Sequence, residues 1–262
     1  MYPAGFEYFA PTSVEEALSV LERYGDEAKV LAGGQSLIPA LNMRLSSPEL
    51  LVDITGLKGL SAIEARNGTV RIGALCTHTQ VERSAEVREH LPLIAEAVAH
   101  IAHPAIRNRG TLGGSLALAD PSAELPACAL ALDAALIVAG RKGERRVPAS
   151  GFFKALYETD LKPDEILVGA EFPKVAKSAF LELARRHGDY AIVGLAAAAK
   201  GVDRRLAFFG MAATPVLIRG KSLDEAKASL KSLKPNGDIY NSPATKLHLA
   251  GVLLERAWPK LS

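Results

Sequence analysis

Two pairs of adjacent glycines, far apart in the sequence, constrain this chain more than any other feature. Gly33-Gly34 ends a short apolar run that begins at Lys29, and Gly113-Gly114 follows the polar stretch 107–111. Adjacent glycines let the backbone approach another group closely, because no Cβ stands in the way and positive φ is accessible. The N–H groups of such a loop can converge on an anion, most often a phosphate. The commonest use of one isolated pair is a tight turn.

Repetition of the motif favours a ligand site over two unrelated turns. Both pairs are soon followed by a serine, Ser36 in the first and Ser115 in the second. We predict two strand–Gly-Gly–Ser loops that form opposite walls of one diphosphate clamp, with Ser36 capping a helix over Leu37–Arg44. The chain has neither a G-x-G-x-x-G fingerprint nor a Walker motif. Spacing alone therefore predicts a phosphate-bearing ligand without identifying it.

The sequence offers no compelling catalytic or metal-binding motif. It lacks G-x-S-x-G and H-E-x-x-H. His100 and His103 are too few for zinc, which needs three or four ligands, so a capping or hydrogen-bonding role is favoured. Asp120 and Glu124 can be interpreted as a paired acid and base, or as acceptors for the hydroxyl groups of a ligand. We predict no catalytic residue and no metal site on this chain.

Composition is that of an ordinary globular protein. Of 262 residues, 48% are hydrophobic and 23% charged, and the formal net charge of +2 does not suggest a nucleic-acid or anionic-membrane partner. No run of about 20 apolar residues exists, and the N-terminus does not resemble a Sec signal, so we expect a cytoplasmic protein. The only cysteines, Cys76 and Cys128, lie in apolar surroundings and are predicted to be buried free thiols.

Hydrophobic patterns and capping residues predict helices and strands in mixed order, which indicates an α+β fold. Helices are expected over 11–25, 77–82, 86–101, 125–134, 222–230 and 242–258. The first sheet is expected to contain strands at 135–139 and 166–173 together with Phe152-Phe153, and Asn67-Gly68 is the expected turn of a hairpin over 63–73. Strands of a second sheet are expected at 178–184, 191–200 and 205–209. Short strands are also expected at Val30-Leu31 and over 50–54.

Two stretches of the chain, the second with its continuation, resemble the two FAD-binding segments of the medium subunit of molybdenum hydroxylases, a family that includes the flavoprotein subunits of carbon monoxide dehydrogenase and xanthine dehydrogenase. They are Ala32–Pro39 and Ile106–Ser115, the latter continued by Ala119–Pro126, and the resemblance extends over nearly the whole chain. It implies an α+β fold with a two-lobed FAD-binding domain of the PCMH/VAO type at residues 1–175, its lobes at about 1–55 and 56–175. A small α+β C-terminal domain of the carbon monoxide dehydrogenase flavoprotein type follows at 176–262.

The resemblance also implies which residues bind FAD, and it implies noncovalent binding. The pyrophosphate is expected between residues 32–37 and residues 111–115, and Glu124 is expected at the ribose. Tyr190 is expected on one face of the isoalloxazine, with a core tyrosine on a strand as the alternative. The expected cofactor-binding residues are Ala32, Gly33, Gly34, Gln35, Ser36, Leu37, Ile101, Ala102, Ile106, Thr111, Leu112, Gly113, Gly114, Ser115, Glu124, Ile166, Leu167 and Tyr190. Among them, Ile101, Ala102 and Ile106 supply apolar surface, and Ile166-Leu167 contacts the adenine end.

One position departs from the family pattern. Several relatives carry a lysine near the flavin where this chain has Glu182. A carboxylate beside the flavin would disfavour an anionic reduced form and lower the potential, whereas a Glu182 that points to solvent would have no such effect.

By this resemblance the chain is an oxidoreductase component that does not act alone on an organic substrate. FAD takes electrons from the [2Fe-2S] clusters of a small partner subunit and passes them to an external acceptor. A large partner subunit holds the molybdenum cofactor, and the three chains form a heterotrimer that can dimerise. A self-contained FAD-dependent oxidoreductase of the same flavin-binding fold is the alternative, and an assembly subunit with a vestigial flavin site is a third interpretation. Carbon monoxide, a purine, an N-heterocycle and an aldehyde are all compatible substrates of the complex.

Overall fold

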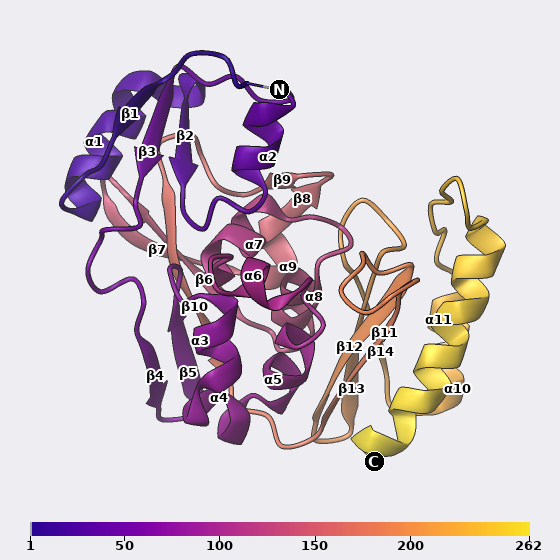
Figure 1. The fold of residues 1–262 in the computed structure, drawn as a ribbon. Helices are drawn as coiled ribbons and strands as arrows, with labels where there is room; N and C mark the ends of the chain where they lie inside the picture. The colour runs from indigo at the N-terminus through magenta and orange to yellow at the C-terminus, as the bar shows by residue number, and fades with distance from the viewer. Residues whose placement is uncertain (1) are drawn as a thin grey trace.

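The computed structural model describes residues 2–262, which form three separate β-sheets and a short two-stranded ribbon (Figure 1). The first sheet consists of β1 (Glu7–Phe9), β3 (Leu50–Asp53) and β2 (Ala28–Leu31), in that order and all parallel. Helix α1 (Val14–Tyr24) buries Ala17, Leu18 and Leu21 in the core that it shares with this sheet. Ser13 caps α1 as predicted, because its side chain accepts the N–H of Glu16.

The segment after β2 leads into the short helix α2 (Leu37–Asn42). Ser36 stands at its N-cap position, but the side chain makes no capping hydrogen bond. The predicted capping role of Ser36 is therefore wrong, since its backbone is already helical at φ −110° and ψ −44° rather than extended.

A five-stranded antiparallel sheet forms the centre of the molecule. Its order is β4 (Ile63–Arg66), β5 (Thr69–Gly73), β10 (Ile166–Pro173), β6 (Ala135–Gly140) and β7 (Gly143–Pro148). The predicted Asn67-Gly68 hairpin turn is confirmed, with Gly68 at φ +77°. Phe152-Phe153 was expected in this sheet, and that prediction is wrong. Phe152 instead ends the short helix α9 (Ala149–Phe152), and Phe153 starts the ribbon of β8 (Phe153–Ala155) and β9 (Glu158–Thr159).

Short helices connect the strands and pack around the sheets. They are η1 (Gly25–Glu27) beside the first sheet, then α3 (His78–Arg83), α4 (Ala85–His90), α5 (Pro92–Val98), α6 (Pro104–Arg107), α7 (Leu112–Leu118) and α8 (Glu124–Ala131). The predicted single helix over 86–101 is broken in two. Pro92 has no N–H to continue α4, and Leu91 leaves the helical region at φ −133°. Cys76 and Cys128 are buried free thiols, as predicted.

A four-stranded sheet in the C-terminal part of the chain packs against α8 on one face and against the terminal helices on the other (Figure 1). Its antiparallel order is β11 (Ser178–Leu183), β12 (Val193–Lys200), β13 (Asp203–Phe209) and β14 (Val216–Gly220), followed by α10 (Leu223–Lys231), α11 (Pro243–Ala257) and η2 (Trp258–Leu261). Alternate residues of β12 join different cores: Ala196 and Ala198 face the central domain, while Leu195 and Ala197 face α11. None of the helices in residues 2–262 is both long and apolar enough to cross a membrane.

Arg205 of β13 joins this sheet to the C-terminal end of α8. Its side chain is 5% exposed and donates to the carbonyl oxygens of Leu130 and Ala131 at 2.8 and 2.9 Å and to Asp133 at 3.0 Å. A cation at a helix C-terminus also interacts favourably with the helix dipole.

We expect Arg205→Ala to lower the free energy of unfolding by about 2–3 kcal/mol, because two buried carbonyl groups lose their donor. Chemical denaturation checks this value. Arg219→Ala is the matched control, since Arg219 is 58% exposed and its ion pair with Asp203 is long, at 4.0 Å. This control substitution should lower the free energy of unfolding by less than about 1 kcal/mol. Equal losses in the two variants would contradict the role given to Arg205.

Candidate functional site

The first glycine pair lies against residues 109–110, which come just before the second pair. A Cβ built on Gly33 would stand 2.2 Å from the carbonyl oxygen of Arg109, so no side chain fits between the two segments. Gly34 has φ +74°, a conformation that glycine adopts without strain. The sequence could not establish this contact, because the two segments are far apart in the chain and follow different elements of the fold.

The first segment presents a row of free donors. Within residues 2–262, the backbone N–H groups of Gly33, Gly34, Gln35 and Ser36 donate no hydrogen bond to the protein. These residues are half-buried or exposed, so the donors remain accessible. Successive free N–H groups beside a residue of positive φ form an anion-binding concavity, which suits a phosphate. The geometry thus fits the predicted role of residues 33–36 at a pyrophosphate.

The second segment is built differently from the prediction. Gly113 and Gly114 lie in the first turn of helix α7, which Thr111 caps by accepting the N–H of Gly114 at 3.1 Å. The N–H of Gly113 already donates to Ala74 at 2.8 Å and that of Leu112 to Cys76 at 2.9 Å. A Cβ on Gly113 would meet the Cβ of Ala74 at 2.5 Å, so this glycine is needed for packing of α7 on β5.

A strand–Gly-Gly–Ser loop was therefore predicted correctly once, at Gly33-Gly34, and wrongly at Gly113-Gly114. The segment predicted as the opposite wall is the start of a helix, and the N–H groups of residues 112–115 donate within the protein. What this wall offers a ligand is the close approach of its backbone and the side chain of Ser115, which is half-buried.

The loop between β11 and β12 passes directly over the segment at Ile101-Ala102. Gly188, at φ +85°, has room for no Cβ, because the carbonyl oxygen of Ala102 would lie 2.4 Å from it. Arg107 braces the same segment by donating to the carbonyl oxygen of Ile101 at 3.0 Å. This contact brings Tyr190, at the end of the loop, to the seam between the C-terminal sheet and the rest of the molecule.

Tyr190 is not a core tyrosine on a strand. It precedes β12 and is 75% exposed. Its pKa is raised by partial burial and by the negative charges of Asp120 and Glu124, which therefore lie near it. Asp120 in turn accepts the Tyr157 hydroxyl at 3.3 Å.

Glu124 begins α8 in a poorly solvated position. Burial, followed by the charges of Glu182 and Asp120, raises the pKa of its carboxyl to about 8. A carboxyl group in such a position can hold a ligand hydroxyl, or a proton, at neutral pH.

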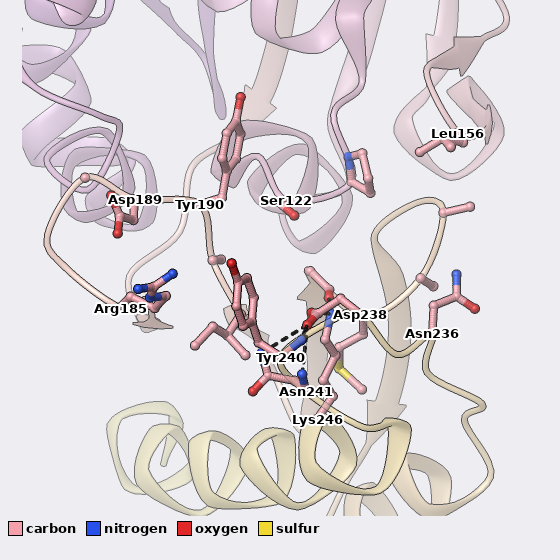
Figure 2. Close-up of a pocket in the computed structure, with 18 residues that line it drawn as sticks. Ser122, Leu156, Arg185, Asp189, Tyr190, Asn236, Asp238, Tyr240, Asn241 and Lys246 are labelled. Carbon is pink, nitrogen blue, oxygen red and sulfur yellow. Dashed lines mark hydrogen bonds and ion pairs between the residues drawn. The ribbon is translucent and has the colours of Figure 1, made fainter.

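A cavity of about 650 Å³ opens below Tyr190 (Figure 2). Figure 2 shows Tyr190 and Tyr240 projecting from the C-terminal part of the chain toward the side that carries Ser122. Arg185 lies at this cavity with its guanidinium 5.2 Å from the centre of the Tyr240 ring. In residues 2–262 no cluster of three or more histidine, cysteine or acidic side chains suits a metal ion.

Comparison with known proteins identifies the family. Residues 4–175 match the model of the FAD binding domain in molybdopterin dehydrogenase. The chain belongs to this family of FAD-binding medium subunits. It is 35% identical over 278 residues to the carbon monoxide dehydrogenase medium chain of Hydrogenophaga pseudoflava, covering 98% of this chain and 97% of that one. It is 47% identical over 199 residues to the 6-hydroxypseudooxynicotine dehydrogenase complex subunit alpha of Paenarthrobacter nicotinovorans, covering 75% of this chain and 67% of that one.

Solved structures confirm the fold of this medium subunit. Carbon monoxide dehydrogenase from Hydrogenophaga pseudoflava superposes with a TM-score of 0.93 at 34% identity, covering 100% of both chains. Quinoline 2-oxidoreductase from Pseudomonas putida 86 gives 0.93 at 35% identity, covering 100% of this chain and 98% of that one. The predicted α+β class, with a FAD-binding domain and a further C-terminal domain, is confirmed, as is assignment to molybdenum-containing dehydrogenases.

Most of the predicted FAD-binding residues of the medium subunit belong to three segments: residues 32–37, the segment 106–115 that meets Gly33 at Arg109-Gly110, and the Ile101-Ala102 segment that meets Gly188. Ile166 and Leu167 are exceptions. They are 2% and 5% exposed at the start of β10 and pack in two different cores, so their side chains support the site from within the sheet. Leu112 is likewise fully buried in the core. Ala32, Leu37 and Ile106 remain half-buried.

Sequence reasoning missed two features of the site and left open the position of a third residue, Glu182. Gly110 packs on the ring of buried His78, whose Cδ2 would be 2.9 Å from a Cβ at that position, and burial together with the charge of Arg107 lowers the pKa of His78 to about 4. Arg185 and Tyr240 line the cavity from the C-terminal domain. Of the two alternatives for Glu182, the one that points to solvent is wrong, because its side chain is only 3% exposed. The one signal in the sequence was Gly110, directly before Thr111, which could have indicated a close contact at this position.

Proposed function

We propose that this chain binds FAD noncovalently and acts as the electron-transfer subunit of a molybdenum hydroxylase complex. The observation that carries the proposal is the contact between the two glycine segments, at which Gly33–Ser36 presents free N–H groups. A dinucleotide diphosphate needs such donors and such close backbone approach. When bound, FAD supplies the redox chemistry, since the isoalloxazine accepts and releases electrons.

Each group of residues has a distinct part in this proposal. The N–H groups of residues 33–36 bind the pyrophosphate, with Thr111 and Ser115 on the opposite side. Glu124 holds a sugar hydroxyl group, and the Ile101-Ala102 segment gives the flavin an apolar surface. Tyr190 covers one face of the ring from the C-terminal side. Ile166 and Leu167 support the adenine end through the backbone of β10.

We propose the same division of labour that the resemblance implies. A small partner subunit with [2Fe-2S] clusters delivers electrons, and a large partner subunit with the molybdenum cofactor oxidises the substrate. The three chains form a cytoplasmic heterotrimer. The separate sheets support a division of this chain into lobes at about 1–55 and 56–175 and a C-terminal domain at 176–262.

The alternative is a self-contained FAD-dependent oxidoreductase with its own substrate pocket. The cavity below Tyr190 favours it to a limited extent, because it lies where a substrate could approach the flavin. Against it, one acid and one base at the cavity are engaged with each other: Lys246 pairs with Asp238 at 2.8 Å, and that contact lowers the pKa of Asp238.

The visible absorption spectrum of the purified chain tests the proposal, with FAD added if the protein is colourless. Flavin bands that pass into the supernatant on acid precipitation are the expected result. The spectrum is then repeated on the chain co-expressed with its molybdenum and iron–sulfur partners. Absence of flavin from that complex would refute the proposal, and oxidation of an organic substrate by the isolated chain would favour the alternative.

A further inference from the structure

The carboxyl group of Glu182 is buried without a partner at the seam between β11 and the central domain. Its side chain is 3% exposed, and its Oε2 makes no hydrogen bond within residues 2–262. Nδ1 of His100, a group able to exchange a proton, lies 3.8 Å from this Oε2. Burial of an unpaired carboxylate is costly, and it raises the pKa of Glu182 to about 7.

The other titratable groups at this seam are acids and two histidines. Glu96 of α5 accepts the N–H of Phe180 at 3.1 Å. Glu124 lies close enough for the charge of Glu182 to raise its pKa, and buried Cys128 lies near both Glu96 and Glu124. Asp120 approaches from the segment before α8. Within residues 2–262, Glu182 forms no ion pair with a lysine or arginine, and burial is what raises its pKa.

His100 connects this site with solvent. Its side chain is 39% exposed, and its ring lies 5.1 Å from that of Phe180 and 5.9 Å from that of exposed His187. Burial and the charge of His187 lower the pKa of His100, which favours the neutral ring, and a neutral imidazole can relay a proton.

We propose that Glu182, supplied through His100, takes up a proton when the flavin at this seam is reduced. The inference rests on the proposed function, because Glu124 and Tyr190 are the residues that place the flavin there. The iron–sulfur clusters of the partner supply two electrons, and the flavin ring takes one proton. The Glu182 carboxylate takes a second proton from water through His100, so the negative charge gained by the ring is compensated.

The test is the midpoint potential of FAD in the complete complex, measured between pH 6 and 8 for the natural chain and for Glu182→Gln. One proton taken up per two electrons shifts the potential by about 30 mV per pH unit. Above pH 7 we expect about 60 mV per unit in the natural chain and about 30 mV in Glu182→Gln, with equal potentials near pH 6. Glu89→Gln, which makes the same change at a 73% exposed carboxylate, should follow the natural chain.

If Glu182→Gln leaves the slope of the FAD midpoint potential against pH unchanged in the flavin-loaded complex, this inference alone is overturned. The same holds if the slope falls in Glu124→Gln and not in Glu182→Gln. A complex without flavin overturns the proposed function as well.

A second readout needs no flavin. A raised carboxyl pKa means that the folded state binds more protons than the unfolded state between pH 4.5 and 7, so stability falls as pH rises through this window. Glu182→Gln should therefore gain stability relative to the natural chain at pH 8 but not at pH 4.5, and equal pH profiles would contradict a buried titrating Glu182.

Discussion

Gly33→Ala should weaken FAD binding about 10- to 100-fold while leaving the chain folded. The added Cβ would stand 2.2 Å from the carbonyl oxygen of Arg109 and 2.9 Å from the Cα of Gly110. Both are backbone atoms, so the two segments can accommodate the methyl group only by moving apart. Overpacking of this kind costs about 1–3 kcal/mol. That cost falls on the geometry of the clamp, and we expect FAD affinity to fall about 10- to 100-fold.

Titration of the full chain with FAD, followed by quenching of flavin fluorescence, measures this loss. Gly56→Ala is the control, because no atom lies within 4 Å of a Cβ at that position and its φ is not positive. It makes the same chemical change in the connection that follows the first sheet, and it should bind FAD like the natural chain. Unchanged affinity in Gly33→Ala would show that the ligand is not held where the two glycine segments meet.

Much of the fold could be predicted because its signals are local. The Ser13 cap, the Asn67-Gly68 turn and the apolar run of β10 each need only a few neighbouring residues to specify their structure. The break at Pro92 was just as local, and it was missed only because apolar periodicity continued on both sides of the proline.

The candidate site was harder to predict, because long-range contacts decide it. Gly113 and Gly33 look equivalent in the sequence, yet one packs a helix against Ala74 and the other leaves room for the backbone at Arg109. Glu182 belongs to a strand with few polar residues, and its burial arises only when the C-terminal sheet meets α5 and α8. Residue type alone contains neither fact.

Gly194→Ala should give the largest loss of stability among single-methyl substitutions in the C-terminal sheet. Gly194 of β12 pairs with Phe209 of β13, and a Cβ there would lie 2.0 Å from Cζ of that ring. The ring cannot easily move away, since Phe209 is fully buried and stacks on Phe180 at 5.7 Å. We expect the free energy of unfolding to fall by about 3 kcal/mol, at the upper end of overpacking costs.

Chemical denaturation of the full chain measures the effect, and Gly251→Ala provides the control. Gly251 lies within α11 and has nothing within 4 Å of a built Cβ, so alanine should stabilise that helix by about 0.5–1 kcal/mol. Opposite signs for the two glycine-to-alanine changes would show that contact with Phe209, and not glycine's flexibility, sets the sequence at Gly194. Because Gly194 also faces Glu182 across the β11–β12 pair, displacement of β12 should in addition expose the Glu182 carboxyl and lower its pKa toward the ordinary value.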